Sequence, residues 1–93
     1  MKRFGIIGFG RFGQLAATHL RDHFTVIVHD SRDVAEDAAR IGVATETLGA
    51  VAACDVVMLA VPVQAIERTL AAIAPHVRPG ALVVDVASVK MLP

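Results

Sequence analysis

The chain has almost none of the residues that build a disulfide-stabilised or membrane-spanning protein. Its 93 residues include one cysteine and neither tryptophan nor tyrosine. Because Cys54 has no second cysteine to pair with, a disulfide within the chain is excluded, which fits a reducing cytoplasm. No stretch approaches the roughly 18 consecutive apolar residues of a transmembrane helix. We therefore expect a cytoplasmic protein.

An excess of charge of one sign is also lacking. Nine Lys and Arg residues balance nine Asp and Glu residues, so the sequence shows no positive surface for nucleic acid or anionic membranes. The four histidines do not have the spacing of a metal site, and we interpret them as structural.

Apolar residues, by contrast, make up 55% of the chain, against a usual value of about 45–50%. Such a composition indicates either a sheet that is covered on both faces or an apolar surface that serves another purpose.

The most informative motif lies in the first thirty residues. A short apolar run leads into Gly8, Gly10 and Gly13, which form the pattern G-x-G-x-x-G, and the next apolar run ends at an acidic residue. Gly8 permits a tight turn from strand to helix, Gly10 lets a diphosphate approach the backbone, and Gly13 lets helix and strand pack closely. Free N–H groups of the helix that begins near Arg11 would hold the diphosphate. With Asp30 as the acidic residue, the motif predicts dinucleotide binding.

Apolar runs and stripes predict strands and helices in regular alternation. Strands are expected at residues 4–8, 24–29, 43–45, 55–61 and 81–86, and helices at 11–21, 33–41, 47–53 and 64–74. Strands joined by helical connections run parallel, and the connections are nearly always right-handed. The sequence therefore predicts one dinucleotide-binding domain over residues 1–93, an α/β fold with a Rossmann-type doubly wound parallel sheet in the order 3-2-1-4-5. The ligand crevice is expected between the first and fourth strands.

The first helix has one apolar stripe. It consists of Phe12, Leu15, Ala16, His19 and Leu20. We expect this stripe to face the sheet, because the residues recur at helical spacing. The Phe12 side chain would then belong to the core, and only its backbone N–H would serve a ligand. Cys54 is expected to be a small core residue.

Three segments carry a family resemblance. They are Gly8-Phe9-Gly10-Arg11-Phe12-Gly13-Gln14, Leu59-Ala60-Val61-Pro62 and Asp85-Val86-Ala87-Ser88-Val89-Lys90. Together they resemble prephenate and arogenate dehydrogenases, and the Ser-Val-Lys of the third segment narrows the choice most. The resemblance implies an oxidoreductase of tyrosine biosynthesis, in which oxidative decarboxylation of the substrate sends a hydride to NAD or NADP.

The resemblance also implies parts that this chain does not contain. In that family a catalytic His follows the Ser-Val-Lys segment, and a helical second domain supplies substrate-binding residues and the dimer interface. The sequence ends at Pro93, so we expect a cofactor-binding half without the second domain, which turns over little or no substrate alone. Ser88 would lie near the nicotinamide and support the absent His, and capping a helix is its alternative role.

Asp30 and the two residues after it bear on the choice between NAD and NADP. A carboxylate at the end of the second strand can accept hydrogen bonds from both hydroxyls of the adenosine ribose and repels a 2′-phosphate, which favours NAD. Ser31 and Arg32 favour NADP, because a hydroxyl followed by Arg can hold a 2′-phosphate. We expect NAD, with NADP as the alternative. A solvated Arg32 at the start of a helix is the structural alternative.

The remaining cofactor contacts are expected on both sides of the crevice. By resemblance, Val61 and Pro62 touch the nicotinamide ribose, although Pro62 also acts as a strand stop. Arg11 either reaches the diphosphate or is exposed to solvent. No metal ligand is expected. The full expected cofactor site is Gly8, Phe9, Gly10, Arg11, Phe12, Gly13, Asp30, Ser31, Arg32, Val61, Pro62 and Ser88.

Two other functions fit the same residues. One is the cofactor domain of another β-hydroxyacid-type dehydrogenase or of an imine reductase, and the other is a non-catalytic NAD-binding or interaction module. The strand at 81–86 would be an apolar sheet edge of the kind that recruits partners. We therefore expect a homodimer, formed through this edge or through the surface that the missing domain would cover. Neither nucleic acid nor a membrane is expected as a partner.

Overall fold

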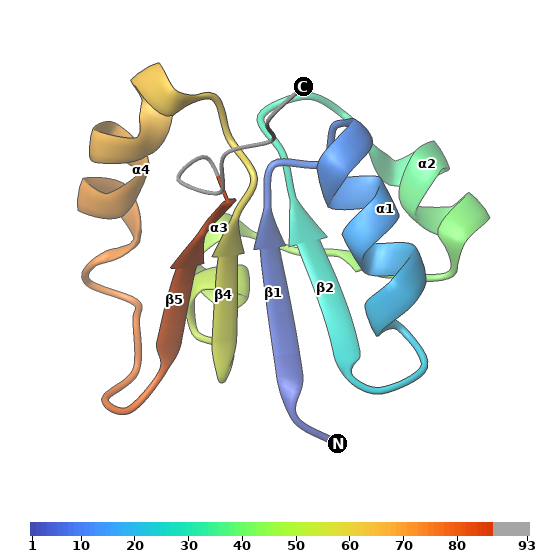
Figure 1. Ribbon diagram of the computed structural model, residues 1–93, viewed down its shortest axis with the longest axis horizontal. Helices are drawn as coiled ribbons and strands as arrows, with labels where there is room; N and C mark the ends of the chain where they lie inside the picture. The colour runs from blue at the N-terminus through green and yellow to red at the C-terminus, as the bar shows by residue number, and fades with distance from the viewer. Residues whose placement is uncertain (87–93) are drawn as a thin grey trace.

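In the computed structural model, which describes residues 1–86, a parallel β-sheet forms the middle layer (Figure 1). The strands are β1 (Arg3–Ile7), β2 (Thr25–His29), β3 (Ala44–Thr45), β4 (Val56–Leu59) and β5 (Leu82–Asp85). The helices are α1 (Arg11–Leu20), α2 (Ala35–Ile41), α3 (Leu48–Ala52) and α4 (Ile66–Ile73), and a short 3-10 helix, η1 (Val63–Ala65), precedes α4. The strand order is β3-β2-β1-β4-β5, which confirms the predicted fold.

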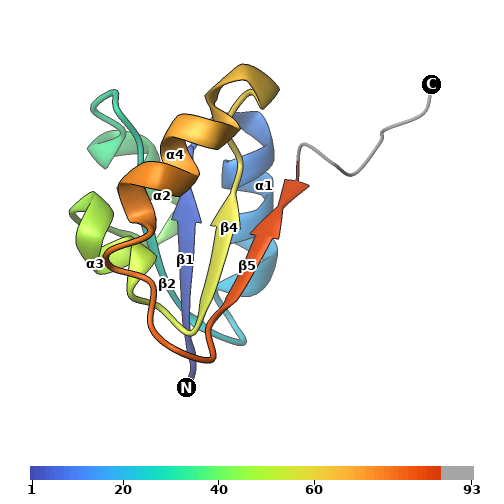
Figure 2. The same ribbon diagram turned by 90° about the vertical axis from the view of Figure 1, so that its left-hand side faces the viewer.

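Helices cover both faces of the sheet, and Figure 2 shows α1 and α4 on opposite sides of the strands. One buried cluster joins the sheet to α1 and α2, and a second joins it to α3 and α4. The central strand β1 serves both clusters, because neighbouring residues of a strand point to opposite faces. Ile6 belongs to the first cluster and Ile7 to the second. This two-sided burial explains why the sequence of β1 is a continuous apolar run.

The predicted buried face of α1 is wrong in part. Phe12 and Leu15 are 42% and 57% exposed, and His19 is exposed as well. The buried residues of the helix are instead Gly13 and Ala17, which lie one turn apart on the same face. The helix therefore contacts the sheet through its smallest side chains rather than through its largest.

Close contact between backbones explains this orientation. A Cβ atom added at Gly13 would lie 2.3 Å from the carbonyl oxygen of Gly8, so that only glycine fits. A helix this close to the strand has no room for an aromatic ring beneath it, and Phe12 is turned to the side. The amphipathic pattern failed to predict this, because it measures hydrophobicity and not size.

A second close contact lies on the opposite face of β1. A Cβ atom at Gly5 would lie 2.3 Å from the carbonyl oxygen of Val51 in α3. Gly5 therefore allows α3 to pack directly on the middle of the sheet. The sequence interpretation gave Gly5 no role, although the residue interrupts an otherwise bulky strand.

The two edges of the sheet differ. The edge strand β3 has only two residues, whereas β5 has four and pairs with β4 on one side only. Leu82 of β5 is 59% exposed, and Val83 is exposed next to it. Among the described residues, β5 thus presents the apolar edge that the sequence predicted.

Replacing Gly13 with Ala should lower the free energy of unfolding by about 2 kcal/mol. Overpacking a close contact costs roughly 1–3 kcal/mol and more against a rigid backbone, which outweighs the gain of about 1 kcal/mol from the better helix propensity of Ala. Gly10→Ala is the matched control, because a Cβ at Gly10 meets no atom within 4 Å. We expect the control to cost less than about 1 kcal/mol. Urea unfolding followed by circular dichroism measures both, and equal midpoints for the two variants would contradict the packing argument.

Candidate functional site

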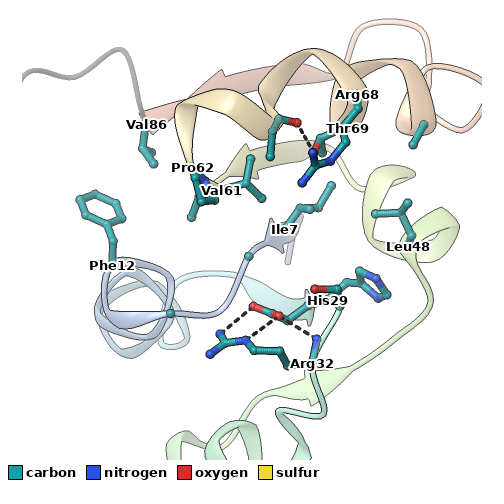
Figure 3. Close-up of a pocket in the computed structure, with 17 residues that line it drawn as sticks. Ile7, Phe12, His29, Arg32, Leu48, Val61, Pro62, Arg68, Thr69 and Val86 are labelled. Carbon is teal, nitrogen blue, oxygen red and sulfur yellow. Dashed lines mark hydrogen bonds and ion pairs between the residues drawn. The ribbon is translucent and has the colours of Figure 1, made fainter.

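A cavity of about 880 Å³ lies where β1, β2 and β4 end (Figure 3). Its walls come from the turns after these strands, from α3 and from η1 and α4. Eight of the residues predicted for the cofactor site line this cavity: Gly8, Gly10, Phe12, Asp30, Ser31, Arg32, Val61 and Pro62. The volume lies within the range of about 300–1,000 Å³ that is usual for pockets of small ligands and cofactors.

Among the described residues, three of the predicted site residues do not line the cavity. The Phe9 side chain is fully buried in the core beside α1, so that only its backbone faces the turn. Arg11 is exposed, and Gly13 is packed against the end of β1. Ser88 lies outside the described residues. Phe12, which we expected to be a core side chain, lines the cavity instead, because the close contact of α1 turns its ring outward.

The turn between β1 and α1 leaves backbone N–H groups available at the cavity. Gly8 takes a positive φ of +98°, which glycine adopts without strain, and its N–H donates to the His29 carbonyl at 2.8 Å. The first hydrogen bond of α1 runs from the Gln14 N–H to the Gly10 carbonyl at 2.9 Å. The N–H groups of Arg11 and Phe12 precede this bond and belong to the positive end of the helix. No acidic residue lies in the first turn to compete for them.

Gly10 differs from the other two glycines of the motif. A Cβ at Gly8 or Gly13 would collide with backbone oxygen atoms at 2.4 and 2.3 Å, whereas one at Gly10 would meet nothing within 4 Å. Gly10 also lines the cavity and has an ordinary negative φ of −79°. Neither packing nor backbone geometry therefore requires glycine at this position. A ligand lying against the backbone would require it.

The Asp30 side chain is only 9% exposed, and its carboxylate accepts four hydrogen bonds. Its Oδ2 atom accepts from the Phe9 N–H at 2.6 Å and from Arg32 Nη2 at 3.1 Å. Its Oδ1 atom accepts from the backbone N–H of Arg32 at 2.9 Å and from Nε at 3.1 Å. The Arg32 guanidinium is the largest cause that lowers the pKa of Asp30 to about 2, while burial opposes the shift. Asp30 is therefore negatively charged at neutral pH.

Arg32 is paired with Asp30 rather than free in solvent. Its side chain is 67% exposed, and the dashed lines in Figure 3 mark its contacts with the carboxylate. The same ion pair raises the pKa of Arg32. Ser31, between the two, is exposed at the mouth of the cavity.

The sequence interpretation missed one wall of the cavity. Leu48 of α3 and Ala65, Arg68, Thr69 and Ala72 of η1 and α4 also line the cavity. Figure 3 shows Arg68 and Thr69 across the cavity from Arg32. These residues lie in short amphipathic helices with no motif of their own, so the sequence offered no signal beyond their position after Pro62. The wall combines the apolar Leu48, Ala65 and Ala72 with the hydroxyl of Thr69 and the guanidinium of Arg68.

Neither a metal-ligand cluster nor a membrane-spanning helix is found in the part of the chain that the structure describes. Within residues 1–86, no three His, Cys, Asp or Glu side chains cluster to hold a metal ion. Over the same residues, no helix is long and apolar enough to span a membrane. Cys54 is buried, as predicted, and burial raises the pKa of its thiol.

Comparison with known proteins gives a family match over most of the chain. Residues 16–93 match the family described as prephenate dehydrogenase, nucleotide-binding domain. A probable arogenate/prephenate dehydrogenase from Methanocaldococcus jannaschii is 46% identical over 39 residues, which are 42% of this chain and 9% of that protein.

Solved structures share the fold. Arogenate dehydrogenase from Synechocystis is 30% identical with a TM-score of 0.84, and the match covers 96% of this chain and 34% of that one. A semialdehyde dehydrogenase NAD-binding protein from Cupriavidus necator, in complex with calcium and NAD, is 29% identical with a TM-score of 0.76. That match covers 91% of this chain and 33% of the other. The chain thus spans about a third of the length of these two relatives.

Protonation of Asp30 should destabilise the fold at low pH. Because the folded-state pKa lies below the unfolded value of 3.8, the carboxylate stabilises the protein fully above about pH 5 and loses this effect as the pH falls through about 2. The shift corresponds to at most about 2 kcal/mol. Between pH 6 and pH 2, we expect the free energy of unfolding, measured in urea, to fall by about 2 kcal/mol more in the wild type than in Asp30→Asn. Parallel curves for the two proteins would contradict the assignment.

Proposed function

Because this chain belongs to the prephenate dehydrogenase nucleotide-binding domain family, we propose that it is the cofactor-binding part of a prephenate or arogenate dehydrogenase-like oxidoreductase. The cofactor is a nicotinamide dinucleotide. One observation carries the proposal: the open N-terminus of α1, the unfilled space at Gly10 and the charged Asp30 carboxylate all meet at a single cavity. A diphosphate flanked by a ribose has the complementary groups.

The residues of the turn fit the diphosphate and the ribose of such a cofactor. The N–H groups of Arg11 and Phe12 would donate to the diphosphate as it lies against Gly10, and Asp30 would accept from the ribose hydroxyls. Val61 and Pro62, at the other end of the cavity, would contact the nicotinamide side. Gly10, Phe12, Asp30, Val61 and Pro62 are assigned because they line the cavity, and Arg11 because it begins α1 next to them.

NAD is favoured over NADP. Asp30 is negatively charged at neutral pH, and its low exposure strengthens the repulsion of a 2′-phosphate. The second residue after it, Arg32, supplies a positive charge at the same rim and reduces this repulsion. The arrangement supports NAD as the main cofactor and NADP as a weaker alternative.

A nicotinamide, when bound, would supply the hydride acceptor for an oxidative decarboxylation of the kind that the proposed dehydrogenase performs. The residues of this chain bind and orient: the turn fixes the diphosphate, and the apolar wall of Val61, Pro62 and Val86 excludes water from the nicotinamide end. Ser88 follows that wall in the sequence and would support the catalytic base of the full-length protein. On its own the chain binds cofactor without turnover.

A second substrate class is supported by one of the structural relatives. The Cupriavidus necator protein, which is almost as similar to this chain as the Synechocystis enzyme, is named for semialdehyde dehydrogenase activity. The alternative is therefore the cofactor domain of a different dehydrogenase, with the same cavity and the same cofactor. Activity of the longer protein on arogenate, prephenate or a semialdehyde would distinguish the two.

The β5 edge supports a homodimer as the form of this chain in solution. Two copies can pair their β5 strands antiparallel about a two-fold axis, which continues the sheet and covers Leu82 and Val83 on both. The described edge strand carries neither proline nor lysine to prevent such pairing.

Calorimetric titration with NAD and NADP tests the cofactor site. We expect NAD to bind more tightly than NADP, and Asp30→Ala to weaken NAD by about tenfold while it weakens NADP less. Gly10→Ala should abolish binding of both, because its methyl group takes the place of the diphosphate. Since Gly10→Ala leaves the fold intact, its loss of binding cannot come from unfolding. Unchanged affinity in Gly10→Ala would contradict the site.

Light scattering tests the homodimer. We expect a dimer at concentrations of about 0.1 mM, and Leu82→Lys should shift it to monomer, because a charged side chain disfavours pairing of edge strands. Leu70→Lys, an exposed leucine on α4, is the control and should remain dimeric. A wild-type monomer at that concentration would overturn the proposal.

A further inference from the structure

The hydrogen-bond acceptors of Asp30 are already occupied in the absence of any ligand. A carboxylate offers about four lone-pair positions, two on each oxygen. In this structure four donors fill them: Phe9 N–H and Arg32 Nη2 on Oδ2, and Arg32 N–H and Nε on Oδ1. The two hydroxyls of a ribose need two of these positions. Two of the present donors must therefore leave before a ribose can bind.

The four donors differ in how easily they can leave. The N–H groups of Phe9 and Arg32 belong to the backbone of the turns after β1 and β2, so their positions are fixed by the fold. The two guanidinium donors belong to a side chain that is 67% exposed, while the carboxylate itself is 9% exposed. Rotation of the Arg32 side chain frees one position on each carboxylate oxygen and moves no backbone atom.

We propose that the Arg32 guanidinium competes with the adenosine ribose for Asp30, so that Arg32 weakens NAD binding and sets the discrimination between NAD and NADP. This inference rests on the proposed cofactor site. Binding of NAD breaks the two guanidinium hydrogen bonds and replaces charged donors with neutral hydroxyls, which are weaker partners of a carboxylate. The displaced guanidinium, two residues from Asp30, would remain near the ribose. It can there bind a 2′-phosphate when the ligand is NADP, because guanidinium groups pair with phosphates in bidentate fashion.

The competition predicts effects of opposite sign for the two cofactors. Arg32→Ala should tighten NAD binding by about three- to tenfold and weaken NADP binding by at least about tenfold. If Arg32 merely held Asp30 in place, Arg32→Ala would release the carboxylate and would weaken NAD binding instead. The two backbone donors remain in the variant, so that Asp30 stays oriented.

Arg40→Ala is the matched control. Arg40 has the same exposed fraction, 67%, and pairs with Asp37 at 2.8 Å, but it does not line the cavity. Removing it changes the net charge by the same amount, and we expect both affinities to change less than about twofold. Tighter binding of NAD by both variants would show that the effect comes from net charge, and it would overturn the proposal.

The experiment is calorimetric titration of the 93-residue chain and its two variants with NAD and NADP. If the wild type binds neither dinucleotide, the proposed function fails. If it binds NAD and Arg32→Ala binds NAD equally or more weakly, the competition alone fails. The ¹⁵Nε–H NMR signal of Arg32 in the wild-type chain gives a second measure that requires no variant. It should shift on addition of NAD, and an unchanged signal at saturation would also overturn the proposal.

Discussion

The contact between the start of α1 and the end of β1 is the constraint on which the site depends. The helix lies so close to the strand that Gly13 has no space for a side chain against the Gly8 carbonyl. This closeness fixes the direction of the helix and so places its free N–H groups at the cavity. It also turns the Phe12 ring out of the core and onto the cavity wall. One backbone contact thus positions both a polar and an apolar part of the site.

The sheet was predictable because its determinants are local. Every strand except the two-residue β3 contains an apolar run, and the right-handed crossover rule leaves few possible orders. The positions of Gly8, Gly10 and Asp30 at the cavity followed from the same topology. The orientation of α1 did not follow, because Gly13 and Ala17 decide it through size, and a hydrophobic stripe ranks Phe12 and Leu15 above them. Arg68 and Thr69 were missed because their place at the cavity depends on how α4 packs.

Asp30 joins two loops that are far apart in the sequence. Its carboxylate accepts from the Phe9 N–H after β1 and from Arg32 N–H after β2, and it thereby fastens the ends of the two central strands together. A buried charge is stable only where donors satisfy it, and four donors do so here. The residue that would recognise a ribose is therefore also one that shapes the turn around it. This explains why a charge persists at a position with so little exposure.

The two lines of argument for the function come from different parts of the chain. The family match begins at Ala16, after the glycine motif has ended at Gly13, so the motif itself adds evidence that the match does not include. Polar and apolar residues line different parts of the cavity. Gly10, Asp30 and Arg32 line the cavity with polar and charged groups, whereas Val61, Pro62 and Val86 form an apolar side near Phe12 (Figure 3). The polar side suits the diphosphate and ribose that all such cofactors share, while the apolar side would face the nicotinamide ring in the proposed site. Differences in substrate among related dehydrogenases can therefore arise at the β4 and β5 ends while the turn after β1 stays the same.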